Sequence, residues 1–315
     1  MKKRNIILSL IFNKDNVWYL IPISLVFALS IHIIVSFIFI KDGWFNNEFS
    51  YAETGIIAFI LSMCNCIPFW YRVKKLKNTK SFSSYTLGIN SCNNIFSSIT
   101  FTSSFIYLLV NPQISLAAIL IRWIPDVIGQ FIHLYTSIYV FIFKIKNCRK
   151  FKDESLAIKF YHWKITVAVI IICLLTAIGL IITIYFKVAN YKGKPTYSNP
   201  TGWTWVYIIA AFHSCLSIIT NVPFIVKLIG TRNTYSVSMY SKVSLLASMF
   251  AWILLDLQTI HIERVDAFLP FLVSDGFVVM WTVIPIVYKS INIYKAKQMH
   301  ITEKVYCEKY CTVYK

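Results

Sequence analysis

Hydrophobic residues gather along this chain into long runs that short polar stretches separate. A helix that spans a membrane needs about 20 mostly apolar residues. We therefore predict an all-α integral membrane protein with eight transmembrane helices. The eight segments that meet the requirement are residues 17–40, 51–71, 83–110, 114–143, 164–187, 203–226, 238–259 and 267–288.

The composition agrees with this pattern. Hydrophobic residues make up 57% of the chain and charged residues only 14%, against about 45–50% and 25% in soluble domains. A disordered chain and a cytosolic enzyme with a polar surface are thereby excluded. The sequence has no metal-ligand spacing, catalytic triad or phosphate-binding loop. We expect a protein that is not an enzyme, has no cofactor or metal, and keeps its cysteines as free thiols.

The basic residues predict the orientation, because cytoplasmic loops of membrane proteins collect Lys and Arg. Of the 31 basic residues, 25 fall in the two termini and the alternate loops on one side, and five fall on the other. Both termini are therefore predicted to be cytoplasmic. The net charge of +18 then reflects the topology and does not indicate nucleic-acid binding. We expect the basic loops to contact anionic lipid at the cytoplasmic face. We favour a bacterial cell membrane, with an organellar membrane as the alternative.

A segment near the end of the second predicted helix occurs again about 155 residues later. The first copy, PFWYRVKKLKNTKSFSSY, begins at Pro68, and the second, PFIVKLIGTRNTYSVSMY, begins at Pro223. Proline, phenylalanine, Asn-Thr, two serines and a tyrosine coincide between them. Because four helices separate the copies, both face the same side of the membrane, as in a parallel repeat.

These residues resemble the PQ-loop repeat, a three-helix unit found in SWEET sugar transporters, cystinosin-like carriers and lysosomal cationic amino-acid exporters. The chain departs from the family motif, since Phe69 and Phe224 stand where the family has glutamine. The resemblance implies two parallel three-helix bundles joined by a linker helix, with an extra N-terminal helix. It divides the chain into a basic N-terminus with the extra helix (1–50), the first repeat (51–146), a basic loop with the linker helix (147–202), the second repeat (203–290) and a basic cytoplasmic tail (291–315).

The two matched prolines are candidate hinges. Proline removes an internal hydrogen bond of a helix and clashes with the preceding turn. Pro68 and Pro223 each lie near the cytoplasmic end of a predicted helix, so both halves carry a weakened turn at the same place. A gating role is the prediction, and simple tolerance of proline in membrane helices is the alternative.

Charged residues inside predicted helices are the candidate site. An ionisable group in the membrane costs about 2.5–3.5 kcal/mol on insertion scales and commonly marks function. Asp126 and Asp275 lie in the third helices of the two halves, and in the resembled family such an acid can couple transport to protons. Arg122 precedes Asp126 by four residues, which predicts a local ion pair. Asp275 has no basic residue within a turn, so we expect it to bind a proton or a cationic substrate, or else to make a structural hydrogen bond. Asp256 is either a cavity group or an interface residue.

Polar side chains recur on one face of the predicted helix 83–110. Asn90 and Asn94, with other Asn, Ser and Thr residues, follow steps of three and four. Such a face has to meet protein or water in a bilayer, so it either lines a solute cavity or bonds a neighbouring helix. Trp123 and Trp252 are candidate stacking surfaces, and the buried histidines are expected to be packed or hydrogen-bonded.

These observations together predict a carrier that moves a small polar solute by alternating access. The preferred solute is an amino acid or similar molecule, with or without proton coupling. A SWEET-type sugar facilitator is the alternative within this class. A membrane receptor or sensor that does not transport its ligand is the alternative of another class.

Overall fold

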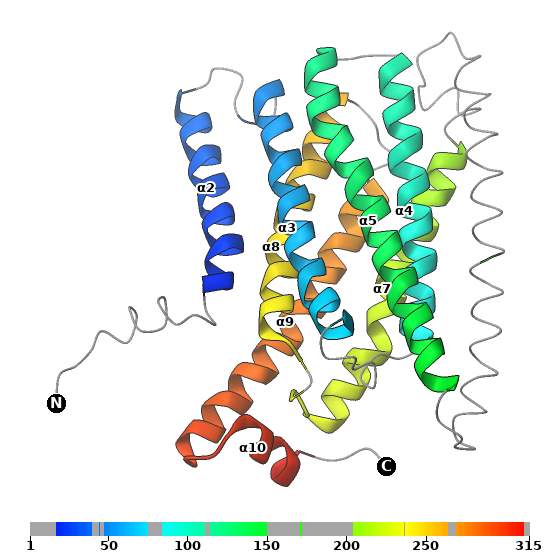
Figure 1. Cartoon of the computed structure of the whole chain (residues 1–315). Coiled ribbons are helices and arrows are strands. Elements are labelled where there is room, and N and C mark those ends of the chain that lie inside the picture. The colour runs from blue at the N-terminus through cyan, green and yellow to red at the C-terminus, as the bar shows by residue number, and fades with distance from the viewer. Residues whose placement is uncertain are drawn as a thin grey trace.

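The computed structural model describes residues 17–39, 44, 47–74, 84–110, 114–149, 171, 204–235, 237–263 and 269–311. This part of the chain is helical and contains no strand (Figure 1). The helices are α2 (Val17–Phe39), α3 (Glu48–Lys74), α4 (Ser84–Val110), α5 (Leu116–Arg149), α7 (Thr204–Thr231), α8 (Met239–Gln258), α9 (Leu269–Gln298) and α10 (Glu303–Tyr310), with a π-helical turn η1 (Thr259–Glu263) after α8.

Helices occupy seven of the eight predicted segments, while the predicted span 164–187 lies outside the described residues except for Ile171. Within the described part of the chain, five helices are long and apolar enough to cross a membrane, which indicates an integral membrane protein. Helices α5 and α9 continue past their predicted ends at 143 and 288. A helix of 30 residues like α9 is about 45 Å long, so it extends beyond the roughly 30 Å hydrocarbon layer, where hydropathy no longer marks its end.

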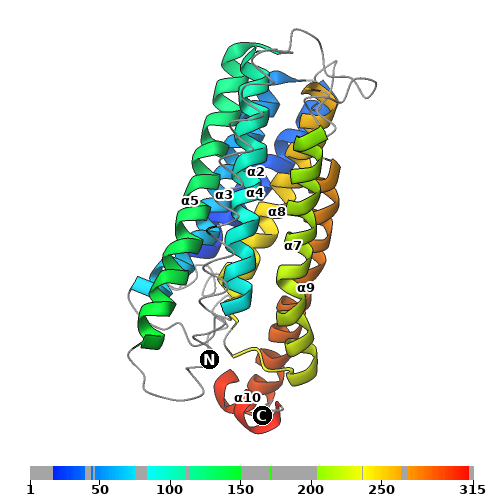
Figure 2. The same cartoon turned by 90° about the vertical axis from the view of Figure 1, so that its right-hand side faces the viewer.

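Six of the helices form a closed ring. Each contacts two neighbours, in the order α3, α5, α4, α7, α9, α8 and back to α3. Helix α2 lies outside this ring against α8 and α3, and Figure 2 shows α3, α4 and α5 beside α7, α8 and α9. The interior of the ring therefore lies between two sets of three helices.

The two sets have the same order of contacts. In each set the first helix contacts the third and the third contacts the second: α3, α5, α4 in one and α7, α9, α8 in the other. The contacts between the sets also match, since α3 meets α8 and α4 meets α7. The first helix of each set thus packs on the second helix of the other, as a two-fold axis through the ring would produce.

The helix directions place the C-terminal ends of α3 and α7 at the same end of the molecule. In Figure 1, α3, α5, α7 and α9 run from the upper end to the lower end, and α2, α4 and α8 run upward. Helix α3 therefore ends at the lower end, where the loop after α7 and the short helix α10 also lie. Helix α5 ends at the lower end and α7 begins at the upper end.

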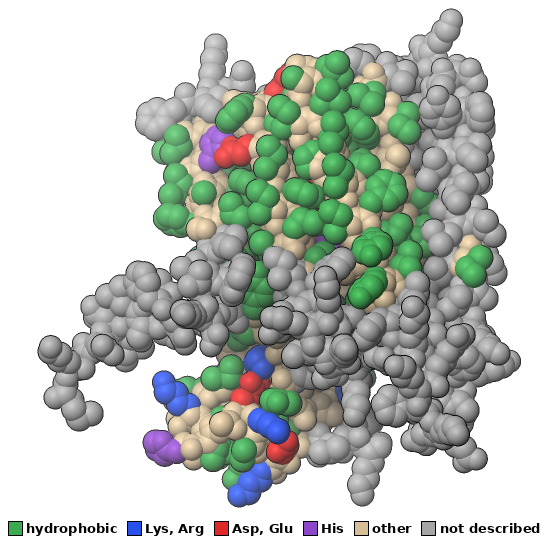
Figure 3. All heavy atoms as spheres, viewed as in Figure 1, with side chains coloured by type: hydrophobic (Ala, Val, Ile, Leu, Met, Phe, Trp, Pro, Cys, Tyr) green, Lys and Arg blue, Asp and Glu red, His purple; other side chains and the backbone are tan. Residues whose placement is uncertain are grey.

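The outward surface is hydrophobic. Large apolar side chains are exposed on several helices, including Phe27 on α2, Ile128 on α5 and Val226 on α7. Figure 3 shows that hydrophobic side chains cover much of the described surface on one face, while the Lys and Arg side chains drawn there gather at the lower end around α10. An apolar exterior with charge at one end is what a lipid environment demands.

Candidate functional site: charged and aromatic residues between the helix sets

The predicted ion pair of α5 is present. The guanidinium of Arg122 contacts the carboxylate of Asp126 one turn later, and both side chains are fully buried. Arg122 and Asp126 lie in the upper half of α5, about 9 and 15 Å along the axis from its first residue. The local pairing that the spacing of four residues predicted is thereby confirmed.

Two aromatic rings and a glycine hold Arg122 in place. The guanidinium carbon lies 4.4 Å from the centre of the Trp123 ring and 5.4 Å from that of Tyr51 on α3, within the range of cation–π attraction. Gly55, one turn after Tyr51, lets α5 approach closely. A Cβ atom at Gly55 would lie 2.6 Å from Cδ of Arg122, which is shorter than a carbon–carbon contact allows.

A second pair of charged groups comes from the other set of helices. Asp256 lies in the last turn of α8 and Asp275 in the second turn of α9. Asp275 and Arg122 are the charged groups that act on Asp256. Its carboxylate is buried, and neither oxygen has a hydrogen-bond partner among the described residues. The four charged residues that the sequence singled out therefore belong to one cluster.

Aromatic side chains fill the space enclosed by the six helices, next to the charged residues. Phe101 of α4 lies 5.9 Å from Trp123 of α5, 5.4 Å from Trp252 of α8 and 5.7 Å from Phe271 of α9, measured between ring centres. Helix α4 is not a neighbour of α8 or α9 in the ring, so these contacts cross its interior. All four side chains are buried, and His213 of α7 lies 4.5 Å from Phe271.

Charged residues and rings of the aromatic contact lie close together along the same helices. Trp252 precedes Asp256 by four residues, and Phe271 precedes Asp275 by four, which places each pair on one face. Trp123 directly follows Arg122. One guanidinium and three carboxylates therefore lie on the same helices as the rings of the aromatic contact between the two helix sets, within about one turn of them. In their ionised form these four charged residues have two more negative than positive charges, so one proton or cation for each excess charge would neutralise them.

A π-helical turn directly follows the α8 part of the site. Residues Thr259–Glu263 form η1, and the N–H of Thr259 is shared between the carbonyls of Leu255 and Asp256. The hydroxyl of Thr259 lies 3.2 Å from that of Tyr51, the residue that also flanks Arg122. Single π-helical turns occur often at functional sites. This one contacts α3 through the Thr259 side chain.

The amide stripe of α4 bonds neighbouring helices. Asn90 and Asn94 donate to the Ser137 hydroxyl of α5 over 3.0 and 2.7 Å. The side-chain amide of Asn93 donates to Ser217 of α7 over 2.9 Å, and the backbone carbonyl of Asn93 accepts from His213. Of the two predicted alternatives, a solute cavity or a bond to a neighbouring helix, the structure shows these amides bonded to neighbouring helices. Asn90 and Asn94 lie on the lower side of the charged site, inside the first helix set.

The matched prolines lie inside helices. Pro68 falls within α3, where its side chain is outside the described residues, and Pro223 falls within α7 and is exposed. Both precede the lower end of their helix by about two turns. Phe224, which follows the second proline, lies under the ammonium of Lys242 at 5.1 Å. Pro68 comes 13 residues after Gly55, which is about 20 Å further along the axis of α3.

Sequence reasoning missed several members of the site. Tyr51, Gly55 and Phe101 were not singled out, and only Gly55 carried a usable signal, since glycine inside a helix costs about 1 kcal/mol against alanine and calls for a packing reason. The predicted free thiols are confirmed for the six cysteines whose side chains the structure describes. No group of metal-ligating side chains occurs among the described residues.

We compared the chain with models of known protein families, with curated proteins and with solved structures, and none of the three comparisons gives a match.

Proposed function

We propose that this protein is a membrane carrier of a small polar solute, built from two PQ-loop-like helix sets and an eight-span topology with both termini in the cytoplasm. The solute is an amino acid or a similar molecule that bears a positive charge, and its movement is coupled to protons. The two sets rock against each other, so that the site between them opens alternately to the two sides.

The convergence of Arg122, Asp126, Asp256 and Asp275 supports the proposal most. A protein without a ligand to bind would gain nothing from three carboxylates against one base, because each buried unpaired charge costs several kcal/mol. Asp256 has two oxygens without a partner among the described residues. A proton or an ammonium group of the solute would supply the missing positive charge.

The matched contacts of the two helix sets support the rocking motion. A site on a pseudo-two-fold interface can be exposed to either side by the same relative movement of the two sets. The aromatic contact made by Phe101 crosses that interface, so it has to separate before a solute passes. Pro68 and Pro223 would weaken one helix of each set at equivalent places.

The excess of carboxylates also favours one alternative over the others. A sugar has no charge for Asp256 and Asp275 to neutralise, so a sugar facilitator would leave them unpaired. A receptor that binds a cation would keep the site but would not move the ligand. Uptake measurements separate these possibilities.

The first test is uptake by purified protein in proteoliposomes. Amino acids, amines and sugars are supplied with and without a pH gradient, and empty vesicles are the control. We expect accumulation of a cationic or zwitterionic solute when the gradient is present. Uptake of sugars alone, or binding without uptake of any solute, would overturn the proposal in favour of a facilitator or a receptor.

The hinges require a separate test. Pro68→Ala and Pro223→Ala should each restore a helical hydrogen bond and leave an inserted protein with slower transport. Transport at the wild-type rate in both variants would show that the prolines are only tolerated.

A further inference from the structure

The short helix α10 packs against the lower end of the second helix set. Helix α9 ends in a turn where His300 has a positive φ of 54°, with hydrogen bonds from the amide of Ile301 to Ala296 and from that of His300 to Lys297. This is the Schellman arrangement, which reverses the chain after a helix. The turn lets α10 fold back and pack against α9. The side chain of Thr302 caps the N-terminus of α10.

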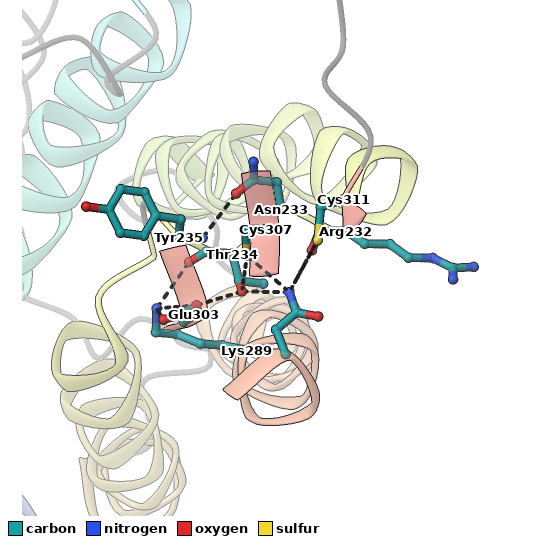
Figure 4. A network of polar contacts seen from close by, with 9 residues as sticks. Arg232, Asn233, Thr234, Tyr235, Lys289, Glu303, Cys307 and Cys311 are labelled. Atoms are coloured by element: carbon teal, nitrogen blue, oxygen red, sulfur yellow. Dashed lines mark hydrogen bonds and ion pairs between the residues drawn. The ribbon is translucent and has the colours of Figure 1, made fainter. Parts of the chain in front are cut away.

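Polar contacts join α10 to the loop that follows α7 (Figure 4). Lys289 of α9 donates to both carboxylate oxygens of Glu303 over 2.8 Å. The Thr234 hydroxyl donates to the same carboxylate over 2.9 Å, and the Thr234 carbonyl accepts from Lys289. Asn292 of α9 donates to the Thr234 hydroxyl over 2.9 Å. Thr234 belongs to the repeated Asn-Thr motif and is fully buried.

The same network holds a strained residue. Arg232 has a φ of 54°, a left-handed conformation that is unfavourable for a residue with a Cβ atom. Its carbonyl accepts hydrogen bonds from Asn292 at 2.8 Å and from the Cys311 thiol at 3.3 Å. Ala296, Tyr306, Cys307 and Cys311 form a small apolar core beneath these bonds. The loop conformation thus depends on both α9 and α10.

We propose that α10 is a clamp that joins the lower ends of α7 and α9 into one rigid unit, which moves as a whole on Pro223 and Pro285 when the protein changes conformation. Both prolines lie inside their helices, and α7 contacts α9 along the bundle. Pro285 precedes Lys289 by one turn, so the clamp begins directly below it. The two prolines weaken the turns of α7 and α9 that lie above the clamp. The clamp ties the lower ends of these two helices together.

The first test measures the clamp itself and does not depend on transport. Burial, with the neighbouring Cys307, raises the pKa of the Cys311 thiol to about 11, and only the thiolate reacts with alkylating reagents. In purified protein, alkylation at Cys307 and Cys311, read by mass spectrometry, therefore reports release of α10. Glu303→Gln leaves the buried ammonium of Lys289 without its counter-charge and should speed alkylation about tenfold or more.

Two further variants control this measurement. Glu308→Gln changes an acid of α10 that is 64% exposed and reaches only Lys304, at 4.0 Å, so alkylation should keep the wild-type rate. Thr302→Ala removes the cap and should speed alkylation about fivefold, even if Glu303→Gln disturbs folding. Wild-type alkylation rates in both Glu303→Gln and Thr302→Ala would overturn the clamp.

The second test asks whether α10 stays docked during movement, and it rests on the proposed transport function. The Thr234 hydroxyl oxygen lies 3.9 Å from the Cys307 sulfur, so Thr234→Cys can form a disulfide with Cys307 under a mild oxidant. Cys311→Ser is added to remove the competing thiol. We expect the oxidised protein to transport within twofold of the reduced protein. Loss of transport on oxidation, restored by dithiothreitol, would show that α10 has to detach and would overturn movement as one unit.

Failure of the two proposals can be told apart. If no solute is transported by the wild type, the proposed function fails, whereas the alkylation rates still decide whether α10 is a clamp.

Discussion

Removing the acid of the buried ion pair should destabilise the protein strongly. Asp126→Asn keeps the shape of the side chain and leaves Arg122, which has no exposed surface, without its neighbouring counter-charge. Breaking a buried pair in this way costs about 3–5 kcal/mol. Asp256 also acts on Arg122, and the rings of Trp123 and Tyr51 remain. We therefore expect a loss of about 2–4 kcal/mol in the free energy of unfolding, below the upper limit.

The assay is denaturant unfolding in detergent micelles, with the double variant Arg122→Met, Asp126→Leu as the matched control. Replacing both charges by apolar groups of similar volume removes the cost of burying them and is commonly neutral or stabilising. The double variant should therefore regain most of the stability that Asp126→Asn loses. Wild-type stability in Asp126→Asn, or a double variant as unstable as the single one, would refute the reasoning.

Two further predictions concern packing and topology. Gly55→Ala places a Cβ 2.6 Å from Cδ of Arg122 and should lower the unfolding free energy by about 1–3 kcal/mol. Gly276→Ala is the control, because nothing lies within 4 Å of that Cβ position, and it should not lower the unfolding free energy. Equal effects of the two substitutions in the same unfolding assay would contradict the close approach of α5 at Gly55. Leu116→Cys at the upper end should react with an impermeant thiol reagent added outside intact cells, and Met299→Cys at the lower end should not; the reverse result would invert the orientation.

Much of the fold follows from the sequence because membrane helices must satisfy their backbone hydrogen bonds internally. Long apolar runs therefore predicted the positions of the described spans. The ends of α5 and α9 were not predictable in this way, since basic residues such as Arg149 and Lys295 continue a helix outside the lipid. Helix α10 was missed for a related reason. Its sequence, with alternating charges around Tyr306 and Cys307, has little apolar content, and the Schellman turn and Lys289 hold it in place.

The site was predictable residue by residue but not as an assembly. A charge in an apolar run is conspicuous, so Arg122, Asp126 and Asp275 stood out, and the spacing of four residues indicated the ion pair. The ring order of the helices, which brings Asp256 to Arg122, is a tertiary property that no local pattern contains. The amides of α4 show the same limit, because Asn94 has the same spacing whether it faces a cavity or Ser137.

We propose that Asp275 carries the protons that drive solute movement. The most direct measurement is uptake into proteoliposomes against an imposed pH gradient by the wild type and by Asp275→Asn, whose insertion is checked by its yield and unfolding in detergent. The account predicts that the wild type accumulates solute and that the folded Asp275→Asn protein loses this accumulation, because an amide cannot bind and release the proton. Undiminished proton-driven uptake by Asp275→Asn would contradict the account.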